Sequence, residues 1–172
     1  MKNYSLVFYI FLGIIIGIFL KLFVFDFTKV EGSSMEPTLK NEQIVCISKL
    51  SYGLVIPFKN RLFLQWKQIN QNDVIIFFSN NNLLVKRCVA TSEQNFSVKK
   101  TPLEFSDKSE YSLIVGEKNI PLTEEQFAFF SQYSCVPKGM FLAIGDNYAS
   151  SIDSRNFGFV NEKNVAGKVL CK

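Results

Sequence analysis

The sequence predicts a mostly β domain, built as an antiparallel sheet or barrel, behind one amino-terminal transmembrane helix. Three observations predict it: a long apolar run at the amino terminus, several short apolar runs after it, and turn-forming residues between those runs. Short strands joined by turns are typical of antiparallel sheets and barrels. The 172 residues have room for an anchor and one compact domain, which we place at residues 1–26 and 27–172.

The apolar run extends from Tyr4 to Phe25, and its only charged residue is Lys21, close to its end. About 20 apolar residues suffice to cross a bilayer. A cleaved secretory signal is the alternative, but the run is longer than an ordinary signal core and no small-x-small site follows it. We therefore expect an uncleaved anchor, with the Lys21 amine reaching the membrane surface.

The chain contains no histidine, which excludes Ser-His-Asp catalysis, Cys-His catalysis and histidine-ligated metal sites. Any nucleophilic catalysis must therefore use a lysine, a carboxylate or an amino terminus as its base. The net charge of +4 is spread along the chain, so we expect no nucleic-acid partner.

The four cysteines, Cys46, Cys88, Cys135 and Cys171, lie far apart and form no CxxC pair, so we expect no metal and no cofactor. Cys46 and Cys88 lie in apolar, strand-like runs and are expected to be buried. An exported domain would permit a disulfide, but the sequence does not determine its pairing.

Apolar runs predict six strands: Ile44–Ser48, Asp73–Phe78, Leu83–Ala90, Ser112–Val115, Met140–Ile144 and Val165–Leu170. The turn-forming residues Ser79–Asn82 join the second and third of these into a hairpin. Thr123 and Gln126 form a capping-box pattern that opens a short helix. The remaining chain between the lysine-bearing strand and residue 135 is mostly polar, so we expect a small, hairpin-like insertion at about 91–135.

The first segment with chemical potential is Gly32–Leu39 (GSSMEPTL), directly after the membrane run. Gly32 permits unusual backbone dihedrals and Pro37 stiffens the following turn, so a hydroxyl here would be held on a rigid loop. The alternative is an ordinary linker rich in serine and proline.

The second segment carries Lys86. Strand alternation places this lysine on one face with Leu84, Cys88 and Ala90, among small or apolar side chains. Removal from water lowers the pKa of a lysine amine from its ordinary value of about 10.4, and a neutral amine beside a serine hydroxyl is a general base. The alternative is a lysine at a strand edge that reaches solvent.

The third segment is Gly145–Arg155 (GDNYASSIDSR), which follows an apolar strand. An ion pair between Asp153 and Arg155 would fix this loop, and one serine hydroxyl would orient the lysine amine. The alternative is a polar surface turn capped by its own side chains.

GSSMEPTL, VKRCVA and GDNYASSIDSR, in this order behind a membrane segment, resemble the three signature boxes of type I signal peptidases, which are serine proteases with a Ser/Lys dyad. QNDVIIF, VPKGMFLAI, FGFV and VAGKV are also similar to that family. The resemblance implies that Ser34 is the nucleophile, that Lys86 is the general base, and that Ser151 hydrogen-bonds and orients the lysine amine.

The resemblance also assigns supporting roles within the third box. Asp146 and Asn147 match its turn, and Asp153 and Arg155 match its structural ion pair. The chain departs from some family members at Gly32, where they carry a hydroxyl that stabilises the oxyanion. Ser33 or a backbone amide is then the candidate second donor. Weaker candidates for the substrate pockets flank the dyad: Met35, Leu39, Val30, Leu84 and Val85.

The function implied by the resemblance is removal of signal peptides from exported preproteins, after small-x-small sites of the Ala-x-Ala type, through an acyl-enzyme. The implied location is a bacterial cytoplasmic membrane, crossed once, with the catalytic domain on the extracytoplasmic side. The expected partners are signal peptides, bound as an added β-strand, and the lipid bilayer.

Three other functions remain open. A specialised relative that matures one pilin or conjugation substrate would use the same dyad. Self-cleaving repressor-type Ser/Lys peptidases are a further alternative, but the amino-terminal anchor argues against them. A membrane-bound module that holds extended peptides without cleaving them would keep its function after Ser34→Ala, and the combination of Ser34, Lys86 and Ser151 argues against it.

Overall fold

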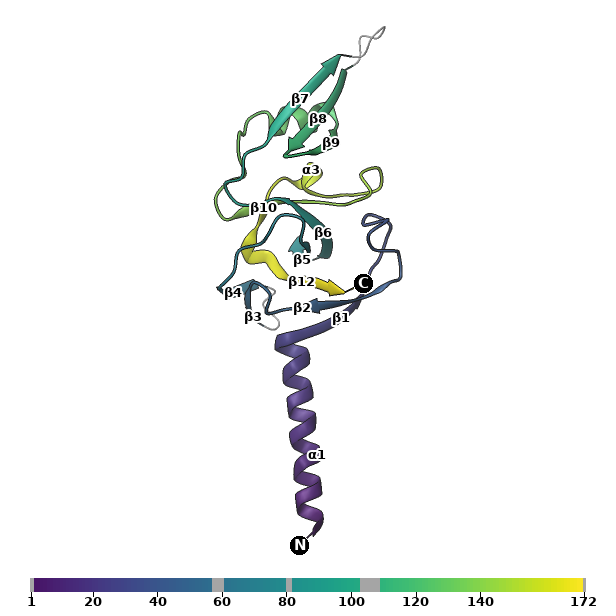
Figure 1. Ribbon diagram of the computed structural model, residues 1–172, viewed down its shortest axis with the longest axis vertical. Helices are drawn as coiled ribbons and strands as arrows, with labels where there is room; N and C mark the ends of the chain where they lie inside the picture. The colour runs from purple at the N-terminus through teal and green to yellow at the C-terminus, as the bar shows by residue number, and fades with distance from the viewer. Residues whose placement is uncertain (1, 57–60, 80–81, 103–108, 172) are drawn as a thin grey trace.

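A long apolar helix precedes the β domain in the computed structural model, which describes residues 2–56, 61–79, 82–102 and 109–171. This helix, α1 (Lys2–Phe19), stands below the domain in Figure 1. From Leu6 to Phe19 its residues are apolar around the whole circumference, which suits a helix surrounded by lipid rather than one packed on a protein core.

α1 continues into one π-helical segment, η1 (Leu20–Val24). The 19 residues from Leu6 to Val24 have a mean hydropathy of 2.6, and none is buried against the domain. At about 1.5 Å per residue they span about 28 Å, close to the hydrocarbon thickness of a bilayer. This is the one helix in the described ranges that is long and apolar enough to cross a membrane. It ends before the predicted boundary at residue 26, because Phe25 already pairs in a strand.

Seven strands form the main sheet, in the order β1-β2-β12-β5-β6-β10-β11, and all their pairings are antiparallel. The prediction of a mostly β domain with antiparallel strands behind one apolar helix is thus confirmed. The strands are β1 (Phe25–Lys29), β2 (Ile44–Ser48), β5 (Val74–Ser79), β6 (Asn82–Ala90), β10 (Met140–Ile144), β11 (Val160–Asn161) and β12 (Val165–Cys171).

Five of the six predicted strands coincide with β2, β5, β6, β10 and β12 to within one residue at each end. β5 and β6 form the predicted hairpin, with Ser79 opposite Asn82. Residues 80–81 of the predicted turn lie outside the described residues. Six strands in the described ranges were not predicted: β1, β3, β4, β7, β9 and β11. β1 was missed because its first residue, Phe25, is also the last residue of the membrane run.

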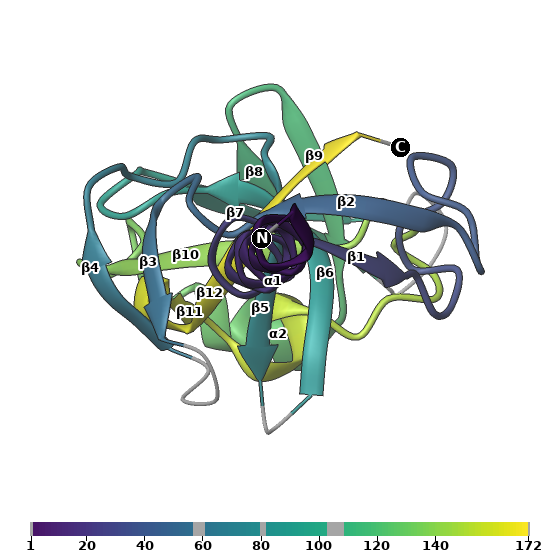
Figure 2. The same cartoon turned by 90° about the horizontal axis from the view of Figure 1, so that it is seen from below.

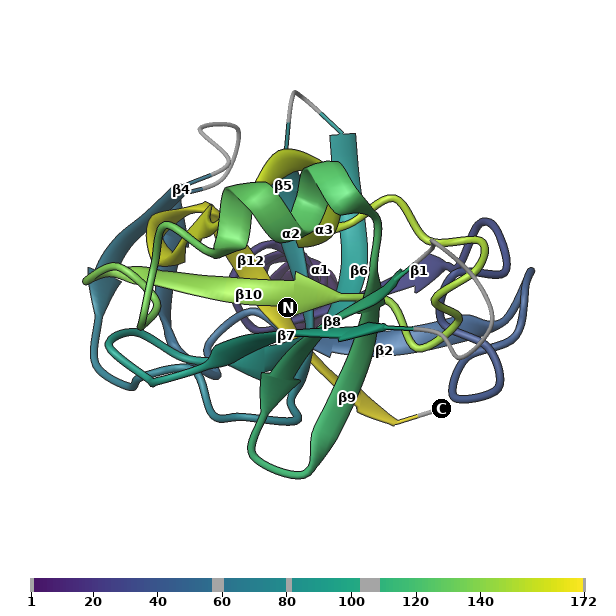
Figure 3. The ribbon, with the colours of Figure 1, turned by 90° about the horizontal axis from the view of Figure 1, so that it is seen from above.

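Two smaller sheets flank the main one. β3 (Gly53–Ile56) and β4 (Arg61–Gln65) form a hairpin at the end of the domain nearest α1. At the opposite end, β7 (Ser97–Pro102), β8 (Ser109–Val115) and β9 (Lys118–Leu122) form a three-stranded sheet, which Figure 3 shows from above.

The insertion after β6 is therefore larger than the single hairpin that the sequence predicted. The sequence indicated β8 alone, because β7 reads SVKKTP and is almost entirely exposed, so it lacks the apolar alternation that marks a half-buried strand. Its pairing with β8 holds it extended. The predicted capping box is present: Thr123 and Gln126 cap α2 (Glu124–Phe130), which packs through Phe130 on this side of the domain.

Three apolar clusters hold these layers together. The one that positions the site fills the space under the loop between β1 and β2, and it consists of Val30, Met35, Leu39, Val45, Ile47, Ile76 and Val169. Figure 2 shows the domain from below, with α1 end-on at its centre, the β3–β4 hairpin on one side and β1–β2 on the other.

The two cysteines expected in the core differ. Cys88 is fully buried, and burial raises the pKa of its thiol to about 12, because an apolar environment disfavours the thiolate. Cys46 is only half-buried, contrary to the prediction, because it lies on the less covered face of β2.

Candidate active site

Ser34 lies on the loop between β1 and β2, and buried side chains fix that loop. Met35 and Leu39 are fully buried in the cluster below it, and the Leu39 N–H donates to the Met35 carbonyl at 2.9 Å. Gly32 has a φ of +86°, a left-handed conformation that glycine adopts without strain, and its N–H donates to Asn41 Oδ1 at 2.8 Å. The serine is thus held on a rigid loop, as the sequence predicted.

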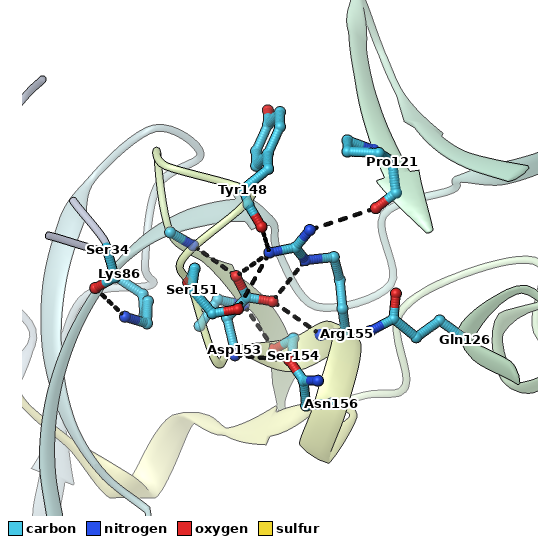
Figure 4. A network of polar contacts seen from close by, with 12 residues as sticks. Ser34, Lys86, Pro121, Gln126, Tyr148, Ser151, Asp153, Ser154, Arg155 and Asn156 are labelled. Carbon is cyan, nitrogen blue, oxygen red and sulfur yellow. Dashed lines mark hydrogen bonds and ion pairs between the residues drawn. The ribbon is translucent and has the colours of Figure 1, made fainter. Parts of the chain in front are cut away.

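Lys86 reaches Ser34 from the middle of β6. Its Nζ lies 2.6 Å from Ser34 Oγ, across 52 residues of sequence (Figure 4). Only 4% of the lysine is exposed, and strand alternation places it on the face of Cys88 and Ala90, as predicted.

The environment of Lys86 favours its neutral form. Burial lowers the pKa of the amine below its ordinary value, and the positive charge of Arg155 acts in the same direction. The carboxylates of Asp153 and Asp146 oppose this, but the net shift is downward. A lysine with a lowered pKa, in contact with a hydroxyl, has the geometry and the proton affinity of a general base.

Asp153 and Arg155 form a buried ion pair in the loop after β10. Asp153 is 0% exposed, and its Oδ1 accepts from Arg155 Nε at 2.9 Å. Its carboxylate also accepts from the backbone N–H of Gly145 at 3.0 Å, at the end of β10, and from that of Arg155 at 3.1 Å, where it caps the short helix α3 (Ser154–Phe157). The predicted pairing is therefore present in the structure.

The guanidinium of Arg155 also holds the surrounding chain. It donates to the Tyr148 carbonyl at 2.8 Å, to the Ser151 carbonyl at 3.3 Å, and to the Pro121 carbonyl of β9 at 3.4 Å. Figure 4 shows this cluster beside the Ser34–Lys86 pair. The ion pair thus connects the loop after β10 to both the main sheet and the three-stranded sheet.

Ser151 lies close to the pair, but the structure contains no hydrogen bond from it to Lys86. Its Oγ is buried and has no hydrogen-bond partner among the described residues. Space here is tight: a Cβ at Gly145 would meet Ser151 Oγ at 2.2 Å and the Ser34 carbonyl at 2.6 Å. A glycine at 145 therefore allows the loop that carries Ser34 and the Ser151 hydroxyl to approach the same point of the backbone.

Asn147 binds the loop that carries Ser34, and Asp146 pairs with Arg87. The Asn147 N–H donates to the Ser34 carbonyl at 3.0 Å, and its Nδ2 donates to the Ser33 carbonyl at 3.3 Å. Asp146 accepts from Arg87 Nε at 2.7 Å and from Arg87 Nη2 at 2.5 Å. These contacts place the predicted third segment directly against the first.

Arg87 is the functional-site residue that the sequence did not indicate. Its guanidinium binds Asp146 and also donates to Thr38 Oγ1, at 3.1 Å. Arg87 therefore joins β6, the loop that carries Ser34 and the loop after β10. Burial alone would raise the pKa of Asp146, but the hydrogen bonds from Arg87 and Thr38 outweigh it and hold that pKa below its usual value. The signal needed to find this pair is the register of β6 and β10, in which Ile144 lies opposite Arg87.

A groove of about 270 Å³ opens beside the Ser34–Lys86 pair. Val30, Leu84 and Val85 line it, as predicted, whereas Met35 and Leu39 do not. Those two side chains are fully buried behind the groove wall, because they anchor the loop that carries Ser34.

Both walls of the groove are open strand edges. On one side, the Val30 N–H donates to the Gln43 carbonyl, and the Val30 carbonyl accepts from the Glu42 N–H. Because main-chain groups alternate in direction along a strand, those of the next residue, Glu31, point away from β2 and into the groove. On the other side, the pairing of β6 with β10 begins only at Arg87, which leaves the preceding residues of β6 unpaired along that edge. An extended peptide fits between two such edges.

No group of three or more cysteine, aspartate or glutamate side chains in the described parts of the chain is placed to hold a metal ion. The Ser33 hydroxyl, a candidate oxyanion donor, lies 3.2 Å from Ser150 Oγ in the loop after β10.

Comparison with known proteins agrees with this geometry. The family model described as signal peptidase, peptidase S26, matches residues 2–172. The chain is 31% identical to Signal peptidase I of Bacillus caldolyticus over 160 residues, which cover 87% of this chain and 80% of the relative. It is 27% identical to Signal peptidase I V of Bacillus subtilis (strain 168) over 164 residues, 91% of this chain and 90% of the relative. It is 27% identical to Signal peptidase IB of Staphylococcus aureus (strain N315) over 157 residues, 81% and 73% of the two chains. The chain therefore belongs to the signal peptidase family, peptidase S26, and is a serine peptidase.

Proposed function

We propose that this protein is a membrane-bound endopeptidase that removes signal peptides from exported preproteins, with Ser34 as nucleophile and Lys86 as general base. The observation that carries the proposal is the 2.6 Å contact between Ser34 Oγ and a buried lysine amine whose pKa is lowered. The relatives named as signal peptidase I support the same substrate class.

The reaction proceeds through an acyl-enzyme. Lys86 Nζ accepts the proton of Ser34 Oγ while that oxygen bonds to the scissile carbonyl carbon. The carbon–nitrogen bond then breaks, and the Lys86 ammonium returns the proton to the leaving amine. Water, deprotonated by the same amine, attacks the ester, and Ser34 Oγ leaves with the proton.

The tetrahedral intermediate carries a negative oxygen that needs hydrogen-bond donors. The backbone N–H of Ser34 is the first donor in this proposal. The Ser33 hydroxyl is the second, since the residue two positions before the nucleophile is Gly32 and has no hydroxyl to offer. The contact between Ser33 and Ser150 keeps the Ser33 side chain beside the loop after β10.

The groove favours small residues at alternate positions of the substrate. An extended chain between the two strand edges turns every second side chain toward the floor formed by Val30 and Val85. The space below that floor is already filled by Met35 and Leu39, so only short side chains fit there. This supports cleavage after small-x-small sites of the Ala-x-Ala type.

Purified full-length protein in detergent is expected to cleave a preprotein with an Ala-x-Ala site at the bond after the second alanine. The product's new amino terminus identifies the bond. A preprotein with lysine in place of that second alanine is the matched control and is expected to stay intact, because the groove floor has no room for a long side chain. A folded enzyme that cleaves neither, or both equally, would contradict the proposed substrate class.

We further propose that the domain lies against the extracytoplasmic surface of a bacterial cytoplasmic membrane that α1 spans. The β3–β4 hairpin supports this, since it lies at the same end of the domain as α1 (Figure 1). Phe63 and Leu64 of β4, and Trp66 directly after it, are exposed. Large exposed apolar side chains at this end of the domain favour a contact with the membrane, and an indole is suited to the membrane interface.

Trp66 is the only tryptophan of the chain and therefore reports on this contact directly. Its indole N–H donates to the Leu50 carbonyl at 3.1 Å, which fixes the ring while leaving it 55% exposed. In proteoliposomes, Trp66 fluorescence is expected to be quenched by lipids brominated near the headgroup, and Phe63→Asp is expected to reduce that quenching. Emission that is equally unquenched in both proteins would contradict contact between the hairpin and lipid.

A further inference from the structure

A second apolar pocket lies at the foot of the sheet, between the end of η1 and the β3–β4 hairpin. It encloses about 260 Å³, and a cavity of about 150 Å³ already takes up a benzene-sized guest. Its charged lining groups, Asp26 and Lys49, form an ion pair at 2.8 Å. The apolar lining includes Leu22, Ile47, Val55, Ile56, Phe78 and Leu83.

This pocket adjoins the groove beside the Ser34–Lys86 pair. Ile76 and Leu83 line both. In the β5–β6 hairpin, Ile76 lies opposite Val85, and Phe78 lies opposite Leu83, so these four side chains share one face of the sheet. They form an apolar strip that runs from the groove beside Lys86 toward the end of η1.

The pocket lies between the end of the apolar segment and the groove that contains Ser34. Leu22 belongs to the end of the apolar segment, and Asp26 follows it at the start of β1. Asp26 precedes Val30 by four residues, which is about 13 Å of extended chain. A substrate that leaves the membrane beside η1 and runs along β1 to the groove therefore passes the pocket before it reaches the dyad.

We propose that this pocket binds an apolar side chain of the preprotein at the carboxyl end of its hydrophobic segment, roughly five to eight residues before the scissile bond. The inference rests on the proposed function. A signal sequence carries an apolar stretch followed by a short region with the cleavage site, so its chemistry matches an apolar pocket upstream of a groove for small residues.

The pocket walls are fixed before the substrate binds. Lys49 Nζ pairs with Asp26 and donates to the Lys21 carbonyl at 3.1 Å, which ties η1 and β1 to the end of β2. Ile47 and Ile76 are buried in the core cluster and form the floor. A preformed apolar site gains affinity without the cost of ordering itself.

The test is a set of peptides that share one Ala-x-Ala site and carry a single leucine or serine at one of the fifth to eighth residues before the scissile bond. With the full-length protein, leucine at one of these positions is expected to raise kcat/KM by about 5- to 20-fold over serine, through KM. Ile56→Ser is expected to abolish that preference.

Leu170→Ser is the matched control, since Leu170 is an exposed apolar residue on β12 of the main sheet and lies outside the pocket. It is expected to keep the leucine preference. An equal preference in the parent and in Ile56→Ser would overturn the inference, and would instead indicate partitioning of the peptide into detergent or lipid. Cleavage of all peptides at one rate would also overturn it. Failure to cleave any of them would refute the proposed function itself.

Discussion

Lys86→Met is expected to lower kcat/KM for an Ala-x-Ala preprotein by about 10³-fold or more, since general-base catalysis contributes up to about 10⁴-fold. Methionine fills the same buried space on β6 but cannot accept the proton of Ser34 Oγ. The variant loses the 2.6 Å hydrogen bond between Lys86 Nζ and Ser34 Oγ. Among the described residues, Lys86 makes no other hydrogen bond with a side chain.

The same variant separates catalysis from folding. Burial lowers the pKa of Lys86 in the folded state, so the unfolded state binds more protons between that lowered pKa and the ordinary one. The buried lysine therefore lowers the free energy of unfolding at neutral pH. This destabilisation disappears as the pH rises from the lowered pKa to the ordinary one. Lys86→Met removes this destabilisation. Near neutral pH, the Tm of the variant is therefore expected to lie at most a few degrees below that of the parent.

The pH profile gives an independent readout. Only the neutral amine accepts a proton, so kcat/KM of the parent is expected to rise with pH and to level off above the lowered pKa of Lys86. Lys118→Met is the matched control: burial also lowers the pKa of Lys118, but its amine contacts Asn72 and not Ser34. It is expected to keep the parent's profile. If Lys86→Met retained a tenth of the parent's rate, Lys86 would not be the base.

The sequence predicted the sheet well where the strands are apolar and isolated. β5, β6, β10 and β12 are short runs of buried residues between polar turns, and their bounds followed from that pattern. β1 could not be separated from the membrane run, because Phe25 belongs to both and no turn lies between them. β7 could not be predicted, because an exposed strand that exists through its partner has no pattern of its own.

For the site, the resemblance indicated candidate residues and the structure supplies their contacts. Ser34 and Lys86 are 52 residues apart, and nothing in their local sequence states that they meet. The Arg87–Asp146 pair was missed because it depends on the pairing of β6 with β10, which is a tertiary property. Ser151 illustrates the opposite case: it was assigned a hydrogen bond to Lys86 that the structure does not contain.

Asp153→Ala is expected to destabilise the domain by about 3–5 kcal/mol, because it leaves the charge of Arg155 buried without a partner. It also removes the acceptor for the N–H of Gly145 and the cap of α3. Thermal unfolding of the purified protein, followed by circular dichroism in detergent, measures the loss. Activity is expected to fall with it, since the loop after β10 carries Asn147, which binds the Ser34 carbonyl.

Two variants show whether the buried charge causes this loss. Glu42→Gln breaks the exposed pair between Lys29 and Glu42, and an exposed pair contributes at most about 1 kcal/mol, so its unfolding is expected to stay near that of the parent. Adding Arg155→Met to Asp153→Ala removes the unpaired cation and is expected to recover part of the stability. A double variant that is clearly less stable than Asp153→Ala would contradict this explanation. Arg155 would then stabilise the domain mainly through its hydrogen bonds to the Tyr148, Ser151 and Pro121 carbonyls, and not through its pairing with Asp153.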